Sequence, residues 1–441
     1  MKNTSYKVLV LGSGGREHAI VWKLTQSEFL HSLYCIPGNG GISKHAKIES
    51  SIKLNEFEKI YEFIKENKID IVIVGPEQPS VEGIKDYLSQ YKIPVFSPTK
   101  IQAQLEGSKI FAKKFMKKYN IPTADFVVAE NYEQAKSLLK EMFSKYKDGI
   151  VIKADGLAAG KGAVVCNTLE EAENTIYEMM IKKIFDKAGE KVVIEKKLNG
   201  IEISVIAFCD GETILPLTYS QDHKQIYDGD KGPNTGGMGA YSPVPFVSKI
   251  LEEKIYSQII NNFLCGIKDS QIGYCGVIYF GLMIENLNTQ PQPYVLEFNC
   301  RFGDPETQVL LPLLKDDFLQ LVIHTINKNL HNFSKLSFEN KYACCVVLAS
   351  KGYPLEYETS KEITGLDEAE KISDVLIFHA GTKKIDNKFL TSGGRVLNVV
   401  GIGKTLQEAI NTSYRAVDKI YFENKYFRTD IGKKGLIYDN I

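Results

Sequence analysis

The sequence predicts an α/β protein in three parts: an N-terminal parallel-sheet domain, a two-lobed core, and a small C-terminal domain of mixed α+β structure. A length of 441 residues suits roughly two to four domains. Short apolar runs alternate with helical patterns at first, as in a parallel sheet with helices on both faces. The pattern then changes at the Pro122 break of a lysine-rich helix and again near Asn332. We therefore expect domains over 1–104, 105–330 and 331–441, with a small lobe at about 122–194 inside the second.

Bulk composition is that of an ordinary globular enzyme and argues against several classes of function. Lysine plus arginine equals aspartate plus glutamate at 54 each, so charge predicts no nucleic acid and no membrane among the partners. No run of about 18 apolar residues occurs, and the N-terminus leads into a strand rather than a signal peptide. The eight cysteines include no CxxC pair, which favours reduced thiols over a structural zinc site. We expect a cytoplasmic protein.

The first predicted strand, 6–11, runs into a glycine turn at 12–15 and a helical pattern from Ala19 to Leu24. This order opens a βαβ unit whose helix N-terminus can hold a phosphate. A dinucleotide site is the obvious rival, but it needs a third glycine where this chain has Glu17, and an acid after the next strand. That strand ends in Pro-Gly-Asn-Gly-Gly at 37–41 instead. The two loops indicate either a site for a phosphorylated small molecule or purely structural turns.

Two further buried strands are predicted at 69–74 and 95–96, and a helix at 57–67 precedes the first of them. Ligands of parallel sheets bind outside the carboxyl ends of the strands. The turns after the first three strands, which begin at Gly12, Pro37 and Gly75, should therefore open onto one edge. Their convergence favours a binding site there.

A helix introduced by Gly107-Ser108-Lys109 carries further lysines at 113, 114, 117 and 118. Lys109, near the helix start, can meet a phosphate, whereas most of the later lysines are expected to form a solvated face. Ile121-Pro122-Thr123 breaks the helix and begins the small lobe.

The stretch Gly149–Val165 reads GIVIKADGLAAGKGAVV and predicts a strand, a glycine-rich turn and a second strand, because β-branched runs bound the turn on both sides. Glycines let backbone N–H groups approach an anion, and Lys153 and Lys161 can bring positive charge to it. A hairpin with two solvated lysines is the alternative. The turn is not a Walker A loop, because Gly162 replaces Ser or Thr and a strand follows instead of a helix.

A strand at 192–198, a linker at Gly200 and a strand from Glu202 to Val205 follow. Such a hinge can pair its backbone with an adenine edge while Glu202 accepts hydrogen bonds from ribose hydroxyls. Taken alone, Glu195 and Glu202 are expected to be surface charges. Beyond them, 222–241 predicts a long loop of small and polar residues, a kind that is usually functional or disordered.

Glu297, Asn299 and Arg301 share one face of a predicted strand, and burying that face without partners would be costly. Carboxylate and amide oxygens suit Mg²⁺, which usually bridges one or two carboxylates to substrate phosphates. Glu285 on a neighbouring strand is a candidate second carboxylate. A solvent-facing edge is the alternative, but the polar run continues through 302–307.

The C-terminal part predicts a strand at 343–349, a small sheet that includes 378–382 and 392–396, and a helix at 406–420. His379 is expected to be structural rather than catalytic.

These segments, in this order, resemble the ATP-grasp ligases and, more narrowly, the phosphoribosylamine–glycine ligase family. The motifs that carry the resemblance are GSGGREHA, PGNGG, GPE, QLEGSK, KADGLAAGKG, SQDHK, GPNTGGMGAYSP and EFNCRFGDPETQ. The resemblance extends from Val8 to Gly432. It implies a Rossmann-like pre-ATP-grasp domain, a two-lobed ATP-grasp core and a small C-terminal domain.

The resemblance also implies an activity. ATP would convert glycine to glycyl phosphate, and the amine of 5-phosphoribosylamine would displace phosphate, an early step of purine synthesis. Glycine and 5-phosphoribosylamine are then the expected substrates, ATP and Mg²⁺ or Mn²⁺ the expected cofactors, and a monomer the expected form. Phosphoryl transfer needs positioning and charge neutralisation more than a protein nucleophile, which agrees with the lack of an evident Ser-His or Cys-His pair.

By resemblance, the ATP site would comprise Lys109, Lys153, Gly156, Gly160, Lys161, Gly162, Glu195, Lys196, Leu198 and Glu202. The metal ligands would be Glu285, Glu297 and Asn299. Phosphoribosylamine would contact Gly14, Gly15, Asn39 and Glu77, and the glycine and acyl-phosphate region would contain Asp222, Lys224, Gly237 and Arg301. Arg301, Lys153 and Asp222 would carry the catalysis. The sequence departs from the family pattern at Lys197, often an aromatic residue, and at Glu285, often an aspartate.

Two rival functions are weighed against this one. Another ATP-grasp carboxylate–amine ligase, or a biotin-dependent carboxylase, would share the glycine-rich loop, but SQDHK and GPNTGGMGAYSP favour the glycine ligase. A non-catalytic nucleotide sensor would have no need to retain Lys153, Glu297, Asn299 and Arg301.

Overall fold

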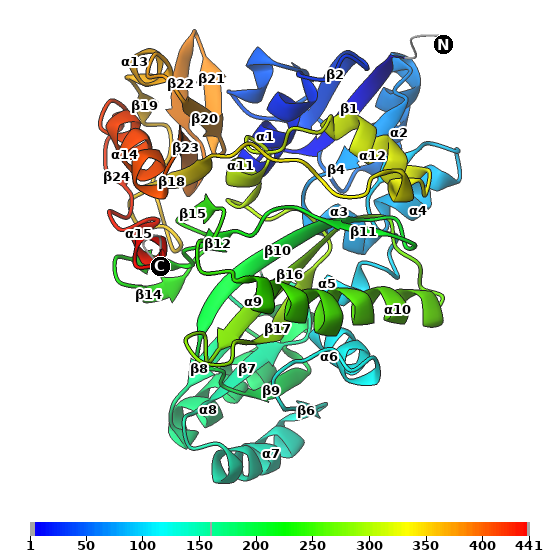
Figure 1. The fold of residues 1–441 in the computed structure, drawn as a ribbon, viewed down its shortest axis with the longest axis vertical. Helices are drawn as coiled ribbons and strands as arrows, with labels where there is room; N and C mark the ends of the chain where they lie inside the picture. The colour runs from blue at the N-terminus through cyan, green and yellow to red at the C-terminus, as the bar shows by residue number, and fades with distance from the viewer. Residues whose placement is uncertain (1–4, 159–160, 439–441) are drawn as a thin grey trace.

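The structure is a computed structural model that describes residues 5–158 and 161–438, and it confirms the predicted α/β class. The N-terminal and C-terminal parts lie next to each other at one end of the molecule (Figure 1). A central sheet lies below them, and a small lobe carrying α7 (Tyr132–Lys145) and α8 (Leu169–Ile176) forms the opposite end.

The N-terminal domain is a parallel sheet of five strands in the order β3-β2-β1-β4-β5. The strands are β1 (Tyr6–Gly12), β2 (Leu30–Pro37), β3 (Lys47–Ile48), β4 (Ile71–Val74) and β5 (Val95–Phe96). The helices are α1 (Gly15–Leu24), α2 (Phe57–Asn67), α3 (Glu77–Glu82) and α4 (Ile84–Ser89). Because all five strands run the same way, the turns after β1, β2 and β4 open onto one edge, as the sequence predicts.

Helix α1 begins at Gly15, four residues before the predicted start at Ala19. The side chain of Glu17 explains the early start, since its Oε2 accepts a hydrogen bond from the backbone N–H of Gly14 at 2.6 Å. A first-turn carboxylate that reaches back in this way satisfies a backbone donor that the helix leaves without a partner. The residue that replaces the third glycine of a dinucleotide fingerprint therefore caps the helix.

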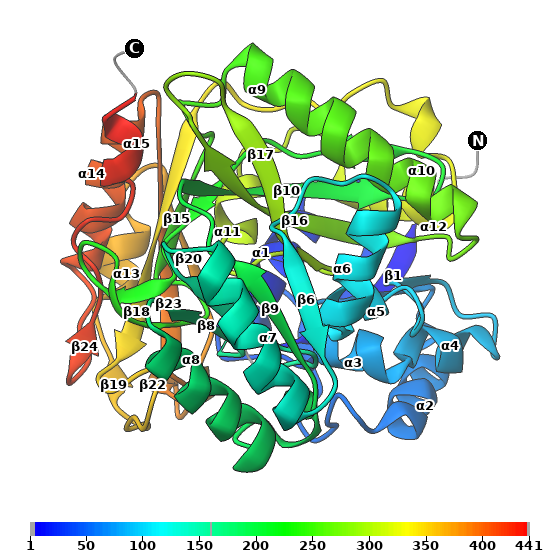
Figure 2. The same ribbon diagram turned by 90° about the horizontal axis from the view of Figure 1, so that it is seen from below.

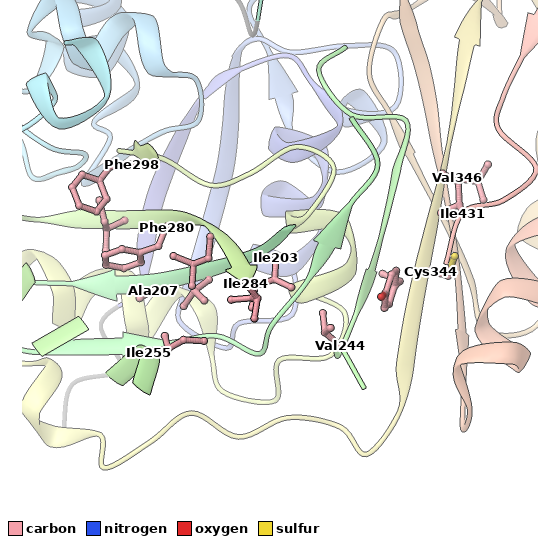
Figure 3. Packing of buried hydrophobic residues seen from close by; sticks show 14 of the residues in the cluster. Ile203, Ala207, Val244, Ile255, Phe280, Ile284, Phe298, Cys344, Val346 and Ile431 are labelled. Atoms are coloured by element: carbon pink, nitrogen blue, oxygen red, sulfur yellow. The ribbon is translucent and has the colours of Figure 1, made fainter. Parts of the chain in front are cut away.

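The core domain is built on an antiparallel sheet in the order β11-β10-β16-β17. Its strands are β10 (Ile201–Cys209), β11 (Ile214–Pro216), β16 (Gly276–Glu285) and β17 (Gln292–Asn299). The helices α6 (Lys109–Lys118), α9 (Lys249–Lys254) and α10 (Asn261–Asp269) belong to the same part of the chain. Phe280 of β16 and Phe298 of β17 pack edge to face at 5.6 Å in the cluster of Figure 3.

The small lobe has its own sheet and its own hydrophobic core. Its strands, in the order β6-β9-β7-β8, are β6 (Phe126–Ala129), β9 (Val192–Lys196), β7 (Ile150–Ala154) and β8 (Ala163–Cys166). A separate buried cluster joins this sheet to α7 and α8. Strands β7 and β8 pair antiparallel, with Ile150 opposite Cys166 and Lys153 opposite Ala163. The strand–turn–strand prediction for 149–165 is therefore confirmed.

The C-terminal sheet is shared between two parts of the chain. Its order is β12-β15-β18-β23-β20, and the first two strands in this order, β12 (Gln221–Asp222) and β15 (Gly239–Ser242), come from the middle of the sequence. The others are β18 (Tyr342–Ser350), β23 (Arg395–Gly403) and β20 (Val375–His379), and helix α14 (Leu406–Val417) packs on β18 and β23. Figure 2 shows β15 alongside β18 and α14 beyond it.

The expectation of one long loop over 222–241 is wrong in part. The segment contains a hairpin, β13 (Gln225–Tyr227) with β14 (Lys231–Asn234), and then enters β15. Small residues serve β15, because Gly239 packs against the backbone oxygen of Cys345 and the side chain of Ile431, with no room for a Cβ. The predicted domain boundaries at 104/105 and 330/331 stay predictions, and the sheet itself crosses the second.

Among the described residues, no helix has the length and apolar character needed to cross a lipid bilayer. The eight cysteines are free thiols.

The separate core of the small lobe predicts a local stability effect. Ile152 of β7 is fully buried, so Ile152→Ala should cost about 2–5 kcal/mol through lost burial and the cavity left behind. The loss should appear as faster amide hydrogen exchange across 126–196, with little change in the N-terminal sheet. Val165→Ala is the matched control in the same lobe, because that side chain is 51% exposed. Equal acceleration by both variants would contradict a separate core.

Candidate functional site

A cleft of about 730 Å³ opens where the small lobe, the core sheet and the two end domains meet. It brings together most residues that the sequence singled out. Those in its walls are Glu77, Lys109, Lys153, Gly156, Lys161, Gly162, Glu195, Lys196, Leu198, Glu202, Asp222, Lys224, Glu297, Asn299 and Arg301. Gly160 lies outside the described residues.

The small lobe supplies the roof of the cleft. Lys153, on β7, is buried and its Nζ donates to the backbone oxygen of Leu296 at 3.0 Å. Lys161 follows the glycine-rich turn and reaches the backbone oxygen of Pro354 in the C-terminal part at 3.2 Å. Lys161 therefore links this turn to the C-terminal part, and Gly156 and Gly162 line the cleft beside Lys153 and Lys161.

Glu195 has a different environment from the one predicted. Its carboxylate is 2% exposed and forms ion pairs with Lys153 and Lys113. Burial alone would raise the pKa of Glu195, but the ammonium groups of Lys113 and Lys153 hold it below the usual range. The carboxylate is thus engaged by lysines, so that an adenine would meet the hinge backbone here rather than this side chain.

The expectation that the later lysines of α6 form a solvated face is wrong for Lys113. Its side chain is 2% exposed and faces the core, whereas the neighbouring Lys114 is exposed. The spacing of four residues from Lys109 places both on one face of the helix, and this is the signal in the sequence that could have found it.

Strand β17 presents Glu297 and Asn299 side by side on one face, and Asn299 Nδ2 lies 3.4 Å from Glu297 Oε1. Lys109, from the start of α6, donates to Glu297 Oε2 at 2.7 Å. Burial would raise the pKa of Glu297, but Lys109 and Lys224 hold it well below its usual range. A permanently charged carboxylate beside an amide oxygen is a donor set that suits a hard cation.

Glu285 does not join this pair, so its assignment as a metal ligand is wrong. The register of β16 on β17 places Gly281 opposite Glu297 and Tyr279 opposite Asn299, whereas Glu285 lies opposite Gln292. Four residues along a strand amount to roughly 13 Å. Glu285 accepts a hydrogen bond from the backbone N–H of Asn199 at 2.9 Å instead. Within 5–158 and 161–438, no group of three or more acids, histidines or cysteines could hold a metal ion.

Arg301 lies where the N-terminal domain meets the core. Its Nε is 3.2 Å from Glu77 Oε2 and 3.3 Å from Glu106 Oε1. Burial opposes ionisation of Glu77, but Arg301 and Arg16 lower the pKa of this carboxyl to about 2. Two acids therefore fix one guanidinium group at the cleft wall. Glu106, which the sequence analysis did not select, also accepts from the backbone N–H of Cys300 at 2.7 Å.

A second group of charges lies at the end of β12. Lys224 contacts the carboxylate of Glu202 at 2.5 Å. Burial raises the pKa of Asp222 to about 7, with Lys224 opposing the rise and Glu306 adding to it. Tyr279, opposite Asn299, completes the group, and its Oη lies 2.8 Å from Ser204 Oγ. Neither Tyr279 nor Glu306 is among the residues that the sequence predicts for the site, although Glu306 belongs to the polar run 302–307.

A smaller pocket of about 360 Å³ opens between the N-terminal and C-terminal domains. Its walls come from glycine-rich turns of both, and they comprise Ser13, Gly14, Gly38, Asn39, Asp304, Ala380, Gly381, Thr382, Ser392, Gly393 and Arg395. Asp304 and Arg395 also line the larger cleft, so the two cavities are neighbours. Arg395 is held by the backbone oxygen of Asp304 at 2.8 Å and by its carboxylate at 3.1 Å.

The side chain of Asn39 is already saturated. Its Nδ2 donates to the backbone oxygens of Ser13 and His379 at 2.8 and 2.7 Å, and its Oδ1 accepts two backbone N–H groups at 2.9 Å. Asn39 therefore shapes the pocket and joins the domains rather than offering a free amide.

Gly15 and Gly237 do not line either cavity among the described residues. Gly15 packs beneath Asn398 and Gln308. Gly237 has φ +111° and lies against Pro305, where a side chain would be strained and would clash. His379 is buried with Nδ1 3.0 Å from Thr382 Oγ1, in keeping with a structural role.

Comparison with known families matches three successive segments of this chain. The phosphoribosylglycinamide synthetase N domain matches residues 6–106, the ATP-grasp (A) domain of the same synthetase matches 107–307, and its C domain matches 343–434.

Whole-chain comparisons agree. The chain is 47% identical to phosphoribosylamine–glycine ligase of Clostridium acetobutylicum over 97% of its own length and 99% of that protein. The crystal structure of phosphoribosylamine–glycine ligase from Thermotoga maritima superposes with a TM-score of 0.82 at 36% identity, over 96% of this chain and 99% of that one. The biotin carboxylase domain of Hydrogenobacter thermophilus 2-oxoglutarate carboxylase, solved with MgADP, ADP and bicarbonate, shares the fold alone, with a TM-score of 0.72 at 15% identity over 96% of this chain and 92% of that one.

The buried carboxyl of Asp222 predicts a pH-dependent stability effect. Burial raises its pKa to about 7 from an ordinary value of 3.8. Between those values the folded chain keeps a proton that the unfolded chain releases, so stability falls as the pH rises through this window. Asp222→Asn should therefore raise the melting temperature at about pH 7.5 much more than at about pH 4.5. Asp148→Asn, at an exposed position, should show no such difference. An equal shift at both pH values for Asp222→Asn would contradict the buried ionisation.

Proposed function

The chain belongs to the phosphoribosylamine–glycine ligase family, and from that premise we propose that it joins glycine to 5-phosphoribosylamine with cleavage of ATP, using the cleft residues in the roles below. The observation that carries the proposal is the meeting of Lys109 and Lys153, from two lobes, with Glu297 and the backbone of β17. Paired cations beside an acid and an amide are what transfer of a phosphoryl group requires.

ATP would bind between the small lobe and the core sheet. The backbone of Lys196 and Leu198 would meet the adenine at the hinge, and Glu202 would meet the ribose. Lys109, Lys153 and the turn containing Gly156 and Gly162 would surround the phosphates, since glycine backbone N–H groups and lysines suit anionic oxygens. The contact between Glu202 and Lys224 would then have to be shared with the ribose hydroxyls.

Glu297 and Asn299 would hold Mg²⁺ or Mn²⁺ together with the nucleotide phosphates. The fit is supported by a charged carboxylate next to a side-chain amide on one strand face, because magnesium commonly takes few protein ligands and several from phosphates. Bound there, the ion would neutralise phosphate charge. Lys109, now on Glu297, would turn to the phosphates.

The reaction would proceed in two steps. A carboxylate oxygen of glycine takes the γ-phosphoryl group of ATP, which releases ADP and gives glycyl phosphate. The amine nitrogen of phosphoribosylamine then attacks the carbonyl carbon, the C–N bond forms, the C–O bond breaks and phosphate leaves with the electron pair. Arg301 and Lys224 suit the carboxylate and the departing phosphate, and Asp222, with its pKa of about 7, suits the proton that the amine loses.

The smaller pocket would receive the phosphate of phosphoribosylamine. It offers the hydroxyl of Ser392, the backbone of Gly393 and the guanidinium of Arg395, which are donors that suit phosphate oxygens. The backbone N–H groups of Gly14, Gly38 and Gly381 already donate within the protein. Its common wall with the cleft, Asp304 and Arg395, would bring the amine toward the activated glycine. Glu77 would act through Arg301 rather than on substrate directly. A cytoplasmic location and a monomeric state stay predictions from the sequence.

The reaction itself is tested by substrate omission. Purified protein given ATP, Mg²⁺, glycine and 5-phosphoribosylamine should release ADP and phosphate and form the phosphoribosyl glycinamide in equal amounts. Leaving out either glycine or the amine should abolish formation of the glycinamide. ADP release that is indifferent to glycine would contradict the proposal.

The metal role predicts a contrast between two acids on adjacent strands. Glu297→Gln should lower kcat by roughly tenfold or more and raise the Mg²⁺ concentration needed for half activity, because a ligand charge is lost. Glu285→Gln is the matched control, since Glu285 lies opposite Gln292 and away from the cleft, and it should retain activity. Full activity of Glu297→Gln, with circular dichroism unchanged, would refute the metal role.

A further inference from the structure

Lys113 is a buried charge next to the cleft that the proposed reaction does not use. Its side chain is 2% exposed, whereas Lys153, which shares its partner, lines the cleft. A lysine is rarely buried so fully without a specific partner, because desolvating its charge is costly. The function of Lys113 must therefore lie in the groups that surround it.

Those groups form a closed path through five segments of the chain. Lys113 Nζ contacts one carboxylate oxygen of Glu195 and donates to Thr123 Oγ1 at 2.6 Å. Thr123 Oγ1 in turn donates to the backbone oxygen of Val295 at 2.7 Å. On the other side of Glu195, Lys153 contacts the second carboxylate oxygen and donates to the backbone oxygen of Leu296.

The path therefore starts and ends on adjacent residues of β17, the strand that carries Glu297 and Asn299. It passes through the connection into the small lobe at Thr123, through α6, and through the strands β9 and β7 of the small lobe. Each member is buried or half-buried. The small lobe is thus linked to β17 through the carboxylate of Glu195.

Lys113 contributes to the charge balance around Glu195. Burial lowers the pKa of Lys113 to about 8, partly opposed by Glu195 and reinforced by the nearby ammonium of Lys153. One carboxylate between two ammonium groups leaves a net positive charge, and of the two lysines it is Lys153 that lines the cleft. Without Lys113, the whole charge of Glu195 would act on Lys153 and compete with any anion in the cleft.

We propose that Lys113 is a positioning residue for nucleotide binding. It takes up part of the charge of Glu195, so that Lys153 stays available to the phosphates, and through Thr123 it fixes the small lobe against β17. This inference rests on the proposed role of Lys153 in ATP binding.

The test compares a ligand with phosphates and one without. In Lys113→Met, which keeps the apolar stem, the Kd of ADP with Mg²⁺ should rise about tenfold, as expected for weakening one hydrogen bond to a charged group. The Kd of adenosine, which has no phosphate, should change less than about twofold. Equal changes for both ligands would mean a merely structural role, and no change for ADP would equally overturn the inference.

Further variants separate charge balance from packing. Lys114→Met, the exposed neighbour, is the matched control and should leave both Kd values unchanged. Adding Glu195→Gln to Lys113→Met removes the competing charge and should bring the Kd of ADP back toward that of the parent. A double variant that binds ADP more weakly than Lys113→Met would contradict the charge argument.

Two further variants test the inference if Lys113→Met does not fold, or if Lys153 does not bind the nucleotide. Should Lys113→Met fail to fold, Thr123→Val removes only the hydroxyl between Lys113 and β17. It should raise the Kd of ADP and leave the Kd of adenosine unchanged. The absence of a selective effect on ADP would refute the positioning role.

Lys153→Met distinguishes the positioning role of Lys113 from its premise, the nucleotide-binding role of Lys153. If Lys153→Met leaves ADP binding intact, the proposed nucleotide role fails. If it weakens ADP binding and Lys113→Met does not, the positioning role alone fails.

Discussion

The buried carboxylate of Glu195, held between Lys113 and Lys153, is the interaction on which the geometry of the cleft depends. Three elements, α6, β7 and β9, each contribute one of these side chains. Because a buried charge without a partner costs several kcal/mol, none of the three elements can shift far without the others. The small lobe is therefore attached to the core at a defined place, and Lys153 is held where the roof of the cleft meets β17.

The register between β16 and β17 is the second constraint. It decides which side chains share the floor of the cleft, and it places Gly281 and Tyr279 opposite Glu297 and Asn299. Gly281 lies directly beside Glu297, where a Cβ would be in ordinary van der Waals contact with the Glu297 side chain at 3.4 Å. Lys109, on α6, forms an ion pair with Glu297 and compensates its negative charge. A cation that arrives with phosphates would find an acid already ionised and oriented.

The end domains are joined through the residues that form the smaller pocket. Asn39 binds the backbone of both Ser13 and His379, and β15 of the middle segment is a strand of the C-terminal sheet. Arg395 lines both cavities. The smaller pocket is therefore assembled by domain packing, and a change that loosens this contact would disturb the distance between the two cavities as well as stability.

The sequence by itself determined the fold class, the order of the main elements, the glycine-rich turn over the cleft, the pair Glu297 and Asn299, and the family. Each of these depends on neighbours along the chain, where the periods of strands and helices and the backbone freedom of glycine act locally. Most predicted ligands do meet in one cleft. Gly14 and Asn39 line the smaller pocket instead, and Gly15, Gly237 and Glu285 line neither cavity.

Only the tertiary structure decided the partners across elements. Glu285 and Glu297 look equivalent in sequence, yet the register of two strands separates them by four positions. Lys113 looks like Lys114 until α6 turns one toward Glu195 and the other toward solvent. Likewise, the small residues of 222–241 are typical of a loop, but the end of this segment pairs with β18 and forms the strand β15. Register, burial and charge pairing are properties of packed elements. Spacing along the chain indicates which side chains share a face, but not which element that face packs against.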